Sequence, residues 1–113
     1  MQTLLVFTNL PDTDSAQSLA RLLIERRLAA CVNILAPCKS VYRWQDRIEE
    51  TAEVPLLIKT TVGCYGGLEA AIRAHHPYEL PEIVAVSIER GLPEYLAWLV
   101  AETSSSQTSD LSC

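Results

Sequence analysis

Hydrophobic and polar positions in the first quarter of the chain predict a strand followed by a helix. Residues 3–8 form a near-continuous apolar run, which is typical of a central strand buried on both faces. Residues 9–12 form a turn, and Asp12 is placed to cap the helix that follows. The helix is indicated by one stripe at three- and four-residue spacing: Ala16, Leu19, Ala20, Leu23 and Ile24.

The middle of the chain predicts a long bent strand and its antiparallel return. The strand covers residues 30–35, is interrupted at Pro37 and resumes at residues 41–44. Because proline cannot donate to a sheet ladder, we expect a bend or a bulge there. Residues 45–47 turn the chain, and residues 48–61 return with alternating side chains.

A second helix, a strand and a short helix are predicted in the remaining part. The second helix opens at Thr61 or Gly63 and ends before Pro77, which cannot continue a helix. Its buried stripe is Leu68, Ala71, Ile72 and His75. Residues 83–88 predict another strand. A short third helix is indicated by Tyr95, Leu96, Leu99 and Val100.

This order of elements predicts an α+β fold, a ferredoxin-like βαββαβ antiparallel sheet with an extra C-terminal helix. One domain of residues 1–102 accounts for the fold, and the Ser/Thr-rich residues 103–113 predict a disordered tail. With both crossover helices on one face, the other face is left with apolar residues such as Val41, Val84 and Val86. A single subunit would expose them, so we expect self-association.

Composition and charge disfavour several classes of function. The 113 residues carry a net charge of −5 without any cluster of Lys and Arg, which argues against nucleic-acid binding. No apolar run is long enough to span a bilayer, and residues 1–6 lack the features of a secretory signal. The four cysteines are scattered without C-x-x-C spacing. We therefore expect a cytoplasmic protein with reduced thiols.

Five blocks of sequence, in this order, resemble the CutA divalent-cation-tolerance family, and together they span roughly residues 4–100. The blocks are Leu28-Ala29-Ala30-Cys31-Val32-Asn33-Ile34, Ser40-Val41-Tyr42-Arg43-Trp44, Ile58-Lys59-Thr60-Thr61, His75-His76-Pro77-Tyr78-Glu79-Leu80-Pro81-Glu82-Ile83 and Tyr95-Leu96-Ala97-Trp98-Leu99. The resemblance implies a tight homotrimer of ferredoxin-like subunits and a link to tolerance of copper and other divalent metals. It also implies an architecture similar to the PII signalling trimers, which bind small effectors between subunits.

Metal binding is the first candidate function, with Cu²⁺ or another divalent cation as the ligand and no organic cofactor evident. The candidate ligands are His75, His76 and Cys31. His75 falls on the apolar stripe of its helix, so it also fits a half-buried structural histidine. Because the helix ends at Pro77, His76 is freer to act as a metal ligand. Cys31 also fits a small buried hydrophobe. Some family members place a further ligand, a cysteine, where this chain has Phe7.

A second group of residues predicts a ligand pocket: Tyr42, Trp44, Lys59, Tyr78, Glu79 and Trp98. Aromatic walls with one ammonium and one carboxylate suit a small anionic or zwitterionic ligand, although the same residues also fit interface anchors. We therefore expect a non-enzymatic trimeric protein of divalent-cation tolerance, with a PII-like metabolite sensor as the alternative. A thiol enzyme is disfavoured because no motif supplies a base or an oxyanion site.

Overall fold

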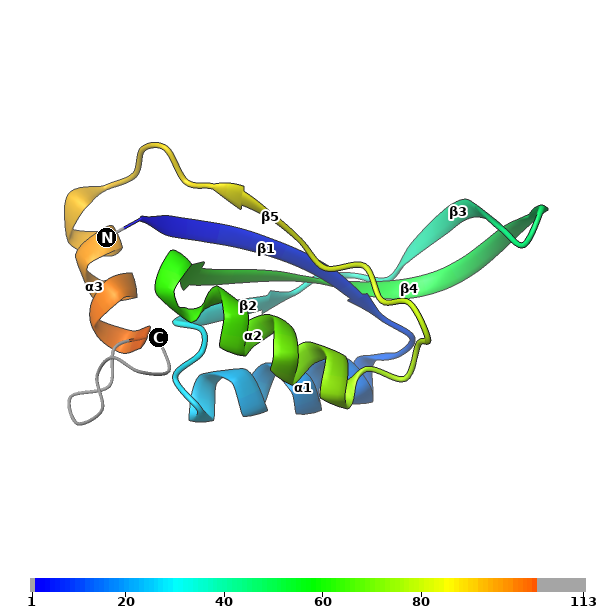
Figure 1. Cartoon of the computed structure of the whole chain (residues 1–113), viewed down its shortest axis with the longest axis horizontal. Helices are drawn as coiled ribbons and strands as arrows, with labels where there is room; N and C mark the ends of the chain where they lie inside the picture. The colour runs from blue at the N-terminus through cyan, green and yellow to red at the C-terminus, as the bar shows by residue number, and fades with distance from the viewer. Residues whose placement is uncertain (1, 104–113) are drawn as a thin grey trace.

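The computed structural model describes residues 2–103 and shows a sheet covered on one face by helices (Figure 1). The elements within these residues are β1 (Thr3–Leu10), α1 (Thr13–Glu25), β2 (Cys31–Ile34), β3 (Cys38–Trp44), β4 (Arg47–Thr61), α2 (Val62–His75), β5 (Val84–Ser87) and α3 (Pro93–Thr103). Met1 and residues 104–113 lie outside this description. No helix among the described residues is long and apolar enough to cross a membrane.

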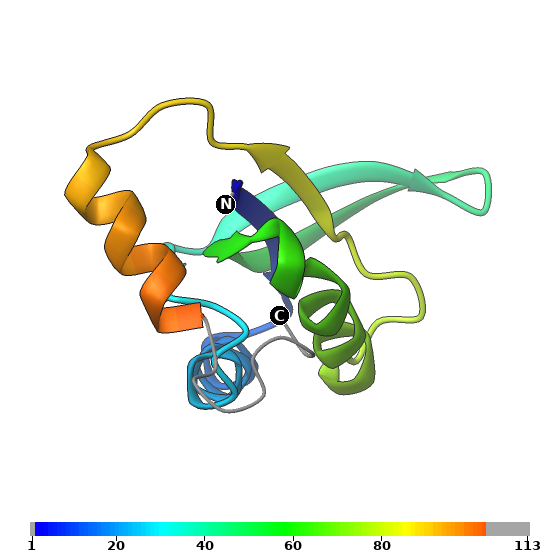
Figure 2. The ribbon, with the colours of Figure 1, turned by 60° about the vertical axis from the view of Figure 1, so that its left-hand side comes forward.

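The strands are ordered β2-β4-β1-β5, and each neighbouring pair is antiparallel. This is the order of a ferredoxin-like sheet, so the predicted α+β fold is confirmed. Helices α1 and α2 lie side by side beneath one face, and α3 lies across the end of the sheet where the chain starts (Figures 1 and 2). A hairpin of β3 and the first half of β4 extends beyond the body of the sheet.

The core lies between the sheet and the two helices. Its fully or almost fully buried members include Val6, Leu10, Leu19, Leu23, Leu56, Ile58, Leu68 and Ile72. Burying one such side chain contributes about 1.5–3 kcal/mol, so this layer is the main source of stability. The stripe predicted for α1 is confirmed except at Ile24, which is 41% exposed because it lies at the margin of the buried face.

The predicted bend at Pro37 is a bulge between two separate strands. In β2 Ile34 pairs with Leu56, whereas in β3 Cys38 pairs with Glu53. Three residues of one strand therefore face two of the other, which is the one-residue excess that defines a bulge. The Leu35 N–H still bonds to the Pro55 carbonyl at 2.9 Å, so β4 holds both strands.

Helix ends agree with the sequence signals. Asp12 caps α1, with its Oδ1 accepting from the Ser15 N–H at 2.7 Å, and this hydrogen bond lowers the pKa of the Asp12 carboxyl. Helix α2 follows Thr61 directly, and its C-cap His76 is extended before Pro77. Helix α3 includes Thr103, one residue beyond the predicted domain boundary, while the rest of the predicted tail lies outside the described residues.

The face of the sheet away from α1 and α2 carries exposed apolar side chains. Leu5 pairs with Val86 and Phe7 with Val84, so these four side chains share that face. Val84 and Val86 are about half exposed, and Leu5 and Phe7 are partly exposed. The predicted burial of β1 on both faces is therefore wrong for the single chain, because its second face has no covering layer over these residues.

Candidate functional site

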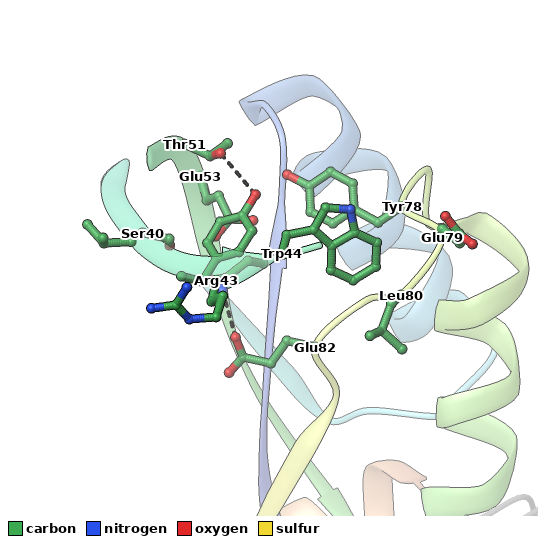
Figure 3. A pocket seen from close by; sticks show the side chains of 12 residues that line it. Ser40, Arg43, Trp44, Thr51, Glu53, Tyr78, Glu79, Leu80 and Glu82 are labelled. Atoms are coloured by element: carbon green, nitrogen blue, oxygen red, sulfur yellow. Dashed lines mark hydrogen bonds between the residues drawn. The ribbon is translucent and has the colours of Figure 1, made fainter. Parts of the chain in front are cut away.

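A cavity of about 780 Å³ lies between the β3–β4 hairpin and the segment that follows α2 (Figure 3). Its walls are Asn9, residues 40–44 of β3, Thr51 and Glu53 of β4, and Tyr78, Glu79, Leu80 and Glu82. Pockets for small organic ligands occupy about 300–1,000 Å³, so this cavity has a suitable size.

The hairpin register explains why these side chains meet. Ser40 pairs with Thr51 and Cys38 with Glu53, and successive residues of a strand alternate between its two faces. Tyr42 and Trp44 therefore share one face with Thr51 and Glu53. The Tyr42 and Thr51 hydroxyls are 3.1 Å apart and hydrogen-bonded, which fixes one aromatic wall.

His76 holds the opposite wall in place. Its Nδ1 accepts from the Tyr78 N–H at 3.1 Å, so Nε2 carries the proton and donates to the Asn9 carbonyl at 2.6 Å. The imidazole is 8% exposed, and its ring centroid lies 4.7 Å from that of Tyr78. His76 thus joins the end of α2 to the end of β1 and orients Tyr78.

A second hydrogen bond fixes the far end of this segment. Asn9 Nδ2 donates to Glu82 Oε1 at 3.0 Å, so Asn9 contacts both ends of residues 76–82. Pro77 and Pro81 restrict the backbone between these two anchors. The wall that carries Tyr78, Glu79 and Leu80 is therefore a shaped segment.

Glu53 is a buried carboxylate at this site, with 7% of its surface exposed. The Tyr78 hydroxyl donates a hydrogen bond to it. Burial, followed by the hydrogen bond and the charge of Glu53, raises the pKa of Tyr78 to about 12. The Tyr78 hydroxyl is therefore protonated near pH 7, and it donates its hydrogen bond to the Glu53 carboxylate.

The predicted pocket is divided between two places. Of the six residues predicted for it, Tyr42, Trp44, Tyr78 and Glu79 line the cavity. Lys59 and Trp98 belong to a separate cluster on the open face of the sheet: Lys59 Nζ donates to Asn33 Oδ1 at 3.0 Å and lies 5.8 Å from the Tyr95 ring centroid. The Tyr95 and Trp98 centroids are 5.4 Å apart.

Asn9, Glu53 and Glu82 also line the cavity, although they were not predicted from the sequence. Glu53 is one of several acidic residues in the hairpin, but the register of the hairpin distinguishes it from the others. Placing the turn at residues 45 and 46 pairs position 38 with position 53 and puts Glu53 on the face of Tyr42. Asn9 and Glu82 are joined across 73 positions of sequence, so tertiary contact alone reveals them.

The expected burial of the two histidines is reversed. His75 is exposed at the end of α2, with Nδ1 2.9 Å from the Ala71 carbonyl, whereas His76 is the buried one. The helix turns the last residue of the predicted stripe toward solvent, and the extended C-cap folds His76 back onto β1. Each ring nitrogen of His76 is engaged by backbone.

Cys31 does not join the histidines within the single chain. Cys31 pairs with Lys59, while Asn9, the partner of His76, pairs with Pro55. These two positions of β4 are four residues apart, or about 13 Å along a strand. Among residues 2–103 no three His, Cys, Asp or Glu side chains are grouped so that they could hold a metal ion.

The architecture is that of a ferredoxin-like α+β protein with an aromatic, carboxylate-lined cavity. The model of the CutA1 divalent ion tolerance protein family matches residues 4–102. The chain belongs to this family.

Individual relatives agree with this assignment. A divalent-cation tolerance protein CutA of Thermus thermophilus is 45% identical over 98 residues, covering 87% of this chain and 95% of that protein. The protein CutA of Mus musculus is 40% identical over 99 residues, 88% of this chain, and the chain spans 56% of that longer relative.

Solved structures give the same result. CutA from Xylella fastidiosa superimposes with a TM-score of 0.89 at 44% identity, covering 92% of this chain and all of that one. A CutA from Archaeoglobus fulgidus, described as a periplasmic divalent cation tolerance protein, has a TM-score of 0.87 at 34% identity, covering 90% of this chain and 99% of that one.

Proposed function

We propose that the protein acts in copper tolerance as a non-enzymatic homotrimer that binds divalent metal. The observation that supports assembly is the exposed apolar surface. Val84 and Val86 on the open face, with Val41 and Ile48 on the hairpin, are 50–68% exposed. Apolar surface of this kind is typical of an interface.

For metal binding, His75 is the best-supported ligand. Its Nδ1 faces the Ala71 carbonyl, which can only accept, so the proton is on Nδ1 and the lone pair on Nε2 is available. His76 belongs to the proposed site as the residue that positions the segment beside it. Cys31 is half-buried, and it would reach an ion together with ligands from another subunit.

Copper titration of the intact protein and three single variants tests this assignment. We expect His75→Ala to weaken Cu²⁺ binding by at least about tenfold, the usual effect of removing one ligand or its support. Cys31→Ser should have a smaller effect, and exposed Arg73→Ala serves as the control. Unchanged affinity in both His75→Ala and Cys31→Ser would contradict metal binding by these residues.

Sedimentation equilibrium of the same samples tests the trimer, because a stable single chain would contradict assembly.

Ligand binding in the cavity is the second proposed function, supported by the aromatic walls around Glu53. We expect a bound metabolite to raise the melting temperature, since binding to the folded state stabilises it by RT ln(1 + [L]/Kd). A thermal-shift panel should give stabilisation that disappears in Trp44→Ala. Lys59→Ala should retain the response because Lys59 lies outside the cavity.

We propose the cytoplasm as the compartment. Cys31 and Cys38 are free thiols, as a reducing environment requires, whereas Cys64 is disulfide-bonded, so the expectation that all thiols are reduced is wrong at Cys64. Osmotic-shock fractionation of the native host would test this, and recovery of the protein in the periplasmic fraction would contradict it.

A further inference from the structure

We propose that the cavity selects an organic cation, a primary ammonium carried on an aromatic or similarly flat apolar group, with the ammonium against Glu53. This inference rests on the second proposed function, ligand binding in the cavity. It reverses the anionic or zwitterionic ligand expected from the sequence, which depended on Lys59. That ammonium lies outside the cavity, bound to Asn33.

The charge of the cavity favours a cation. Glu53, Glu79 and Glu82 line it against one guanidinium, that of Arg43, so three negative charges and one positive charge leave −2. Arg43 lies between Tyr42 and Trp44 on β3, and its side chain therefore leaves the strand on the opposite face. Figure 3 shows its guanidinium directed away from Trp44 and Tyr78.

Glu53 is the group best placed to anchor the ammonium. A carboxylate accepts about four hydrogen bonds, and the Tyr78 hydroxyl occupies one position on Glu53. Because Glu53 is 93% removed from solvent, an ion pair there is screened less than one on the surface. Glu82, in contrast, is already held by Asn9 at the rim.

The aromatic walls complement the same ligand. Tyr42, Trp44 and Tyr78 present ring surface to the cavity, and a cation within about 6 Å of a ring face gains roughly 0.5–2 kcal/mol. Trp44 and Leu80 also line the cavity, where they offer an apolar surface to the body of the ligand. A bare metal ion would leave most of the 780 Å³ unfilled, and the cavity carboxylates are not grouped as metal ligands among the described residues.

A charge series of probes tests the inference on the full chain. Trp98→Phe leaves Trp44 as the single tryptophan, so its fluorescence reports on the cavity. The probes are phenethylammonium, the neutral phenethyl alcohol and the anionic 3-phenylpropionate. We expect the ammonium to bind at least about tenfold more tightly than the alcohol, as for a partly buried ion pair, and the carboxylate to bind weakest.

Two matched variants locate the charge that is responsible. Glu53→Gln should lower ammonium affinity to the level of the alcohol. Glu50→Gln, on the opposite face of the same strand and beside Lys39, should leave it within about twofold because it faces away from the site. If Glu53→Gln fails to fold by circular dichroism, the salt dependence of binding to the wild type provides the second measurement. Added salt should weaken binding of the ammonium more than that of the alcohol, because only the ammonium is charged.

The outcomes also separate this inference from the function on which it rests. Equal or tighter binding of the alcohol or the carboxylate would overturn selection of a cation and leave a ligand-binding cavity in place. Equal ammonium affinity in wild type and folded Glu53→Gln would overturn the anchoring role of Glu53. No Trp44 response to any probe at millimolar concentration would overturn the inference, and a silent thermal-shift panel as well would overturn ligand binding altogether.

Discussion

At the scale of single residues, His76 has the largest structural role near the cavity. It is buried, and its two ring nitrogens form hydrogen bonds with the Asn9 carbonyl and the Tyr78 N–H, which lie 69 positions apart in sequence. A neutral imidazole is the side chain that donates from one edge and accepts at the other. This explains why the position fits a histidine without requiring a metal there.

Removing this imidazole should destabilise the fold. In His76→Ala the Asn9 carbonyl and the Tyr78 N–H lose their partners, and each such group costs about 1–3 kcal/mol when buried, so we expect a loss of about 2–6 kcal/mol. Urea denaturation measures it. His75→Ala is the matched control, since exposed His75 should cost less than about 1 kcal/mol. Equal losses would contradict the structural role of His76.

The Tyr78 hydroxyl should make stability fall in strongly alkaline solution. Its pKa is raised from an ordinary value of 10.0 to about 12, first by burial and then by Glu53. A raised native pKa means that the unfolded chain loses the proton first, so the contribution is complete below pH 10 and is lost as pH rises toward 12. Tyr78→Phe should remove this component of alkaline unfolding.

Titration of the same hydroxyl tests the role of Glu53 directly. Carbon-13 NMR of labelled tyrosine, assigned by comparison with Tyr78→Phe, follows the hydroxyl. Glu53→Gln should lower the Tyr78 pKa while burial keeps it above 10.0, because burial is the larger cause. A pKa unchanged by Glu53→Gln would show that the charge of Glu53 has no part in the shift.

At the scale of elements, the β3–β4 hairpin decides where the cavity forms. Trp44 pairs with Arg47, and the two residues between them, Gln45 and Asp46, have φ angles of 52° and 65°. Two positive φ angles are those of a type I′ turn, whose twist matches that of the strands. The hairpin therefore has a defined register despite carrying a non-glycine residue at each turn position.

A glycine in this turn should stabilise the hairpin. A positive φ angle is sterically unfavourable for every residue except glycine, so Asp46→Gly should raise the free energy of unfolding by about 0.5–1 kcal/mol. Asp46→Ala should lower it, because alanine has neither the freedom of glycine nor the local hydrogen bonding of aspartate. Thermal unfolding measures both variants, and stabilisation by Ala as large as by Gly would contradict the positive φ at this position.

The elements were well predicted where one local signal dominated. Asp12 capped α1, Pro77 ended α2, and Pro37 marked the bulge, since each depends on backbone chemistry within a few residues. The exposure of His75 and the burial of His76 were not predictable in the same way. Both depend on where the extended segment after α2 returns to β1, which is a tertiary contact.

At the scale of the whole molecule, the open face of the sheet predicts concentration-dependent stability. If the subunits associate through Val84 and Val86, the melting temperature should rise with protein concentration by mass action. Val86→Glu should abolish that dependence, because it places a charge on the apolar face. Ala70→Glu adds the same charge on the exposed face of α2 and should preserve it. A melting temperature independent of concentration in the wild type would contradict assembly.

By itself, the amino-acid sequence determined the order of the elements, the ferredoxin-like sheet, the resemblance to the CutA family and the apolar face left uncovered. These follow from periodicity, proline and capping residues, whose effects are local or repeat along one element. The composition of the cavity was decided by tertiary structure. Glu53 is joined with Tyr78, Asn9 with Glu82, and Lys59 is placed elsewhere, because strand register and the return of the chain bring distant residues together. The sign of the charge in the cavity, and so the ligand that it suits, arises from those long-range contacts.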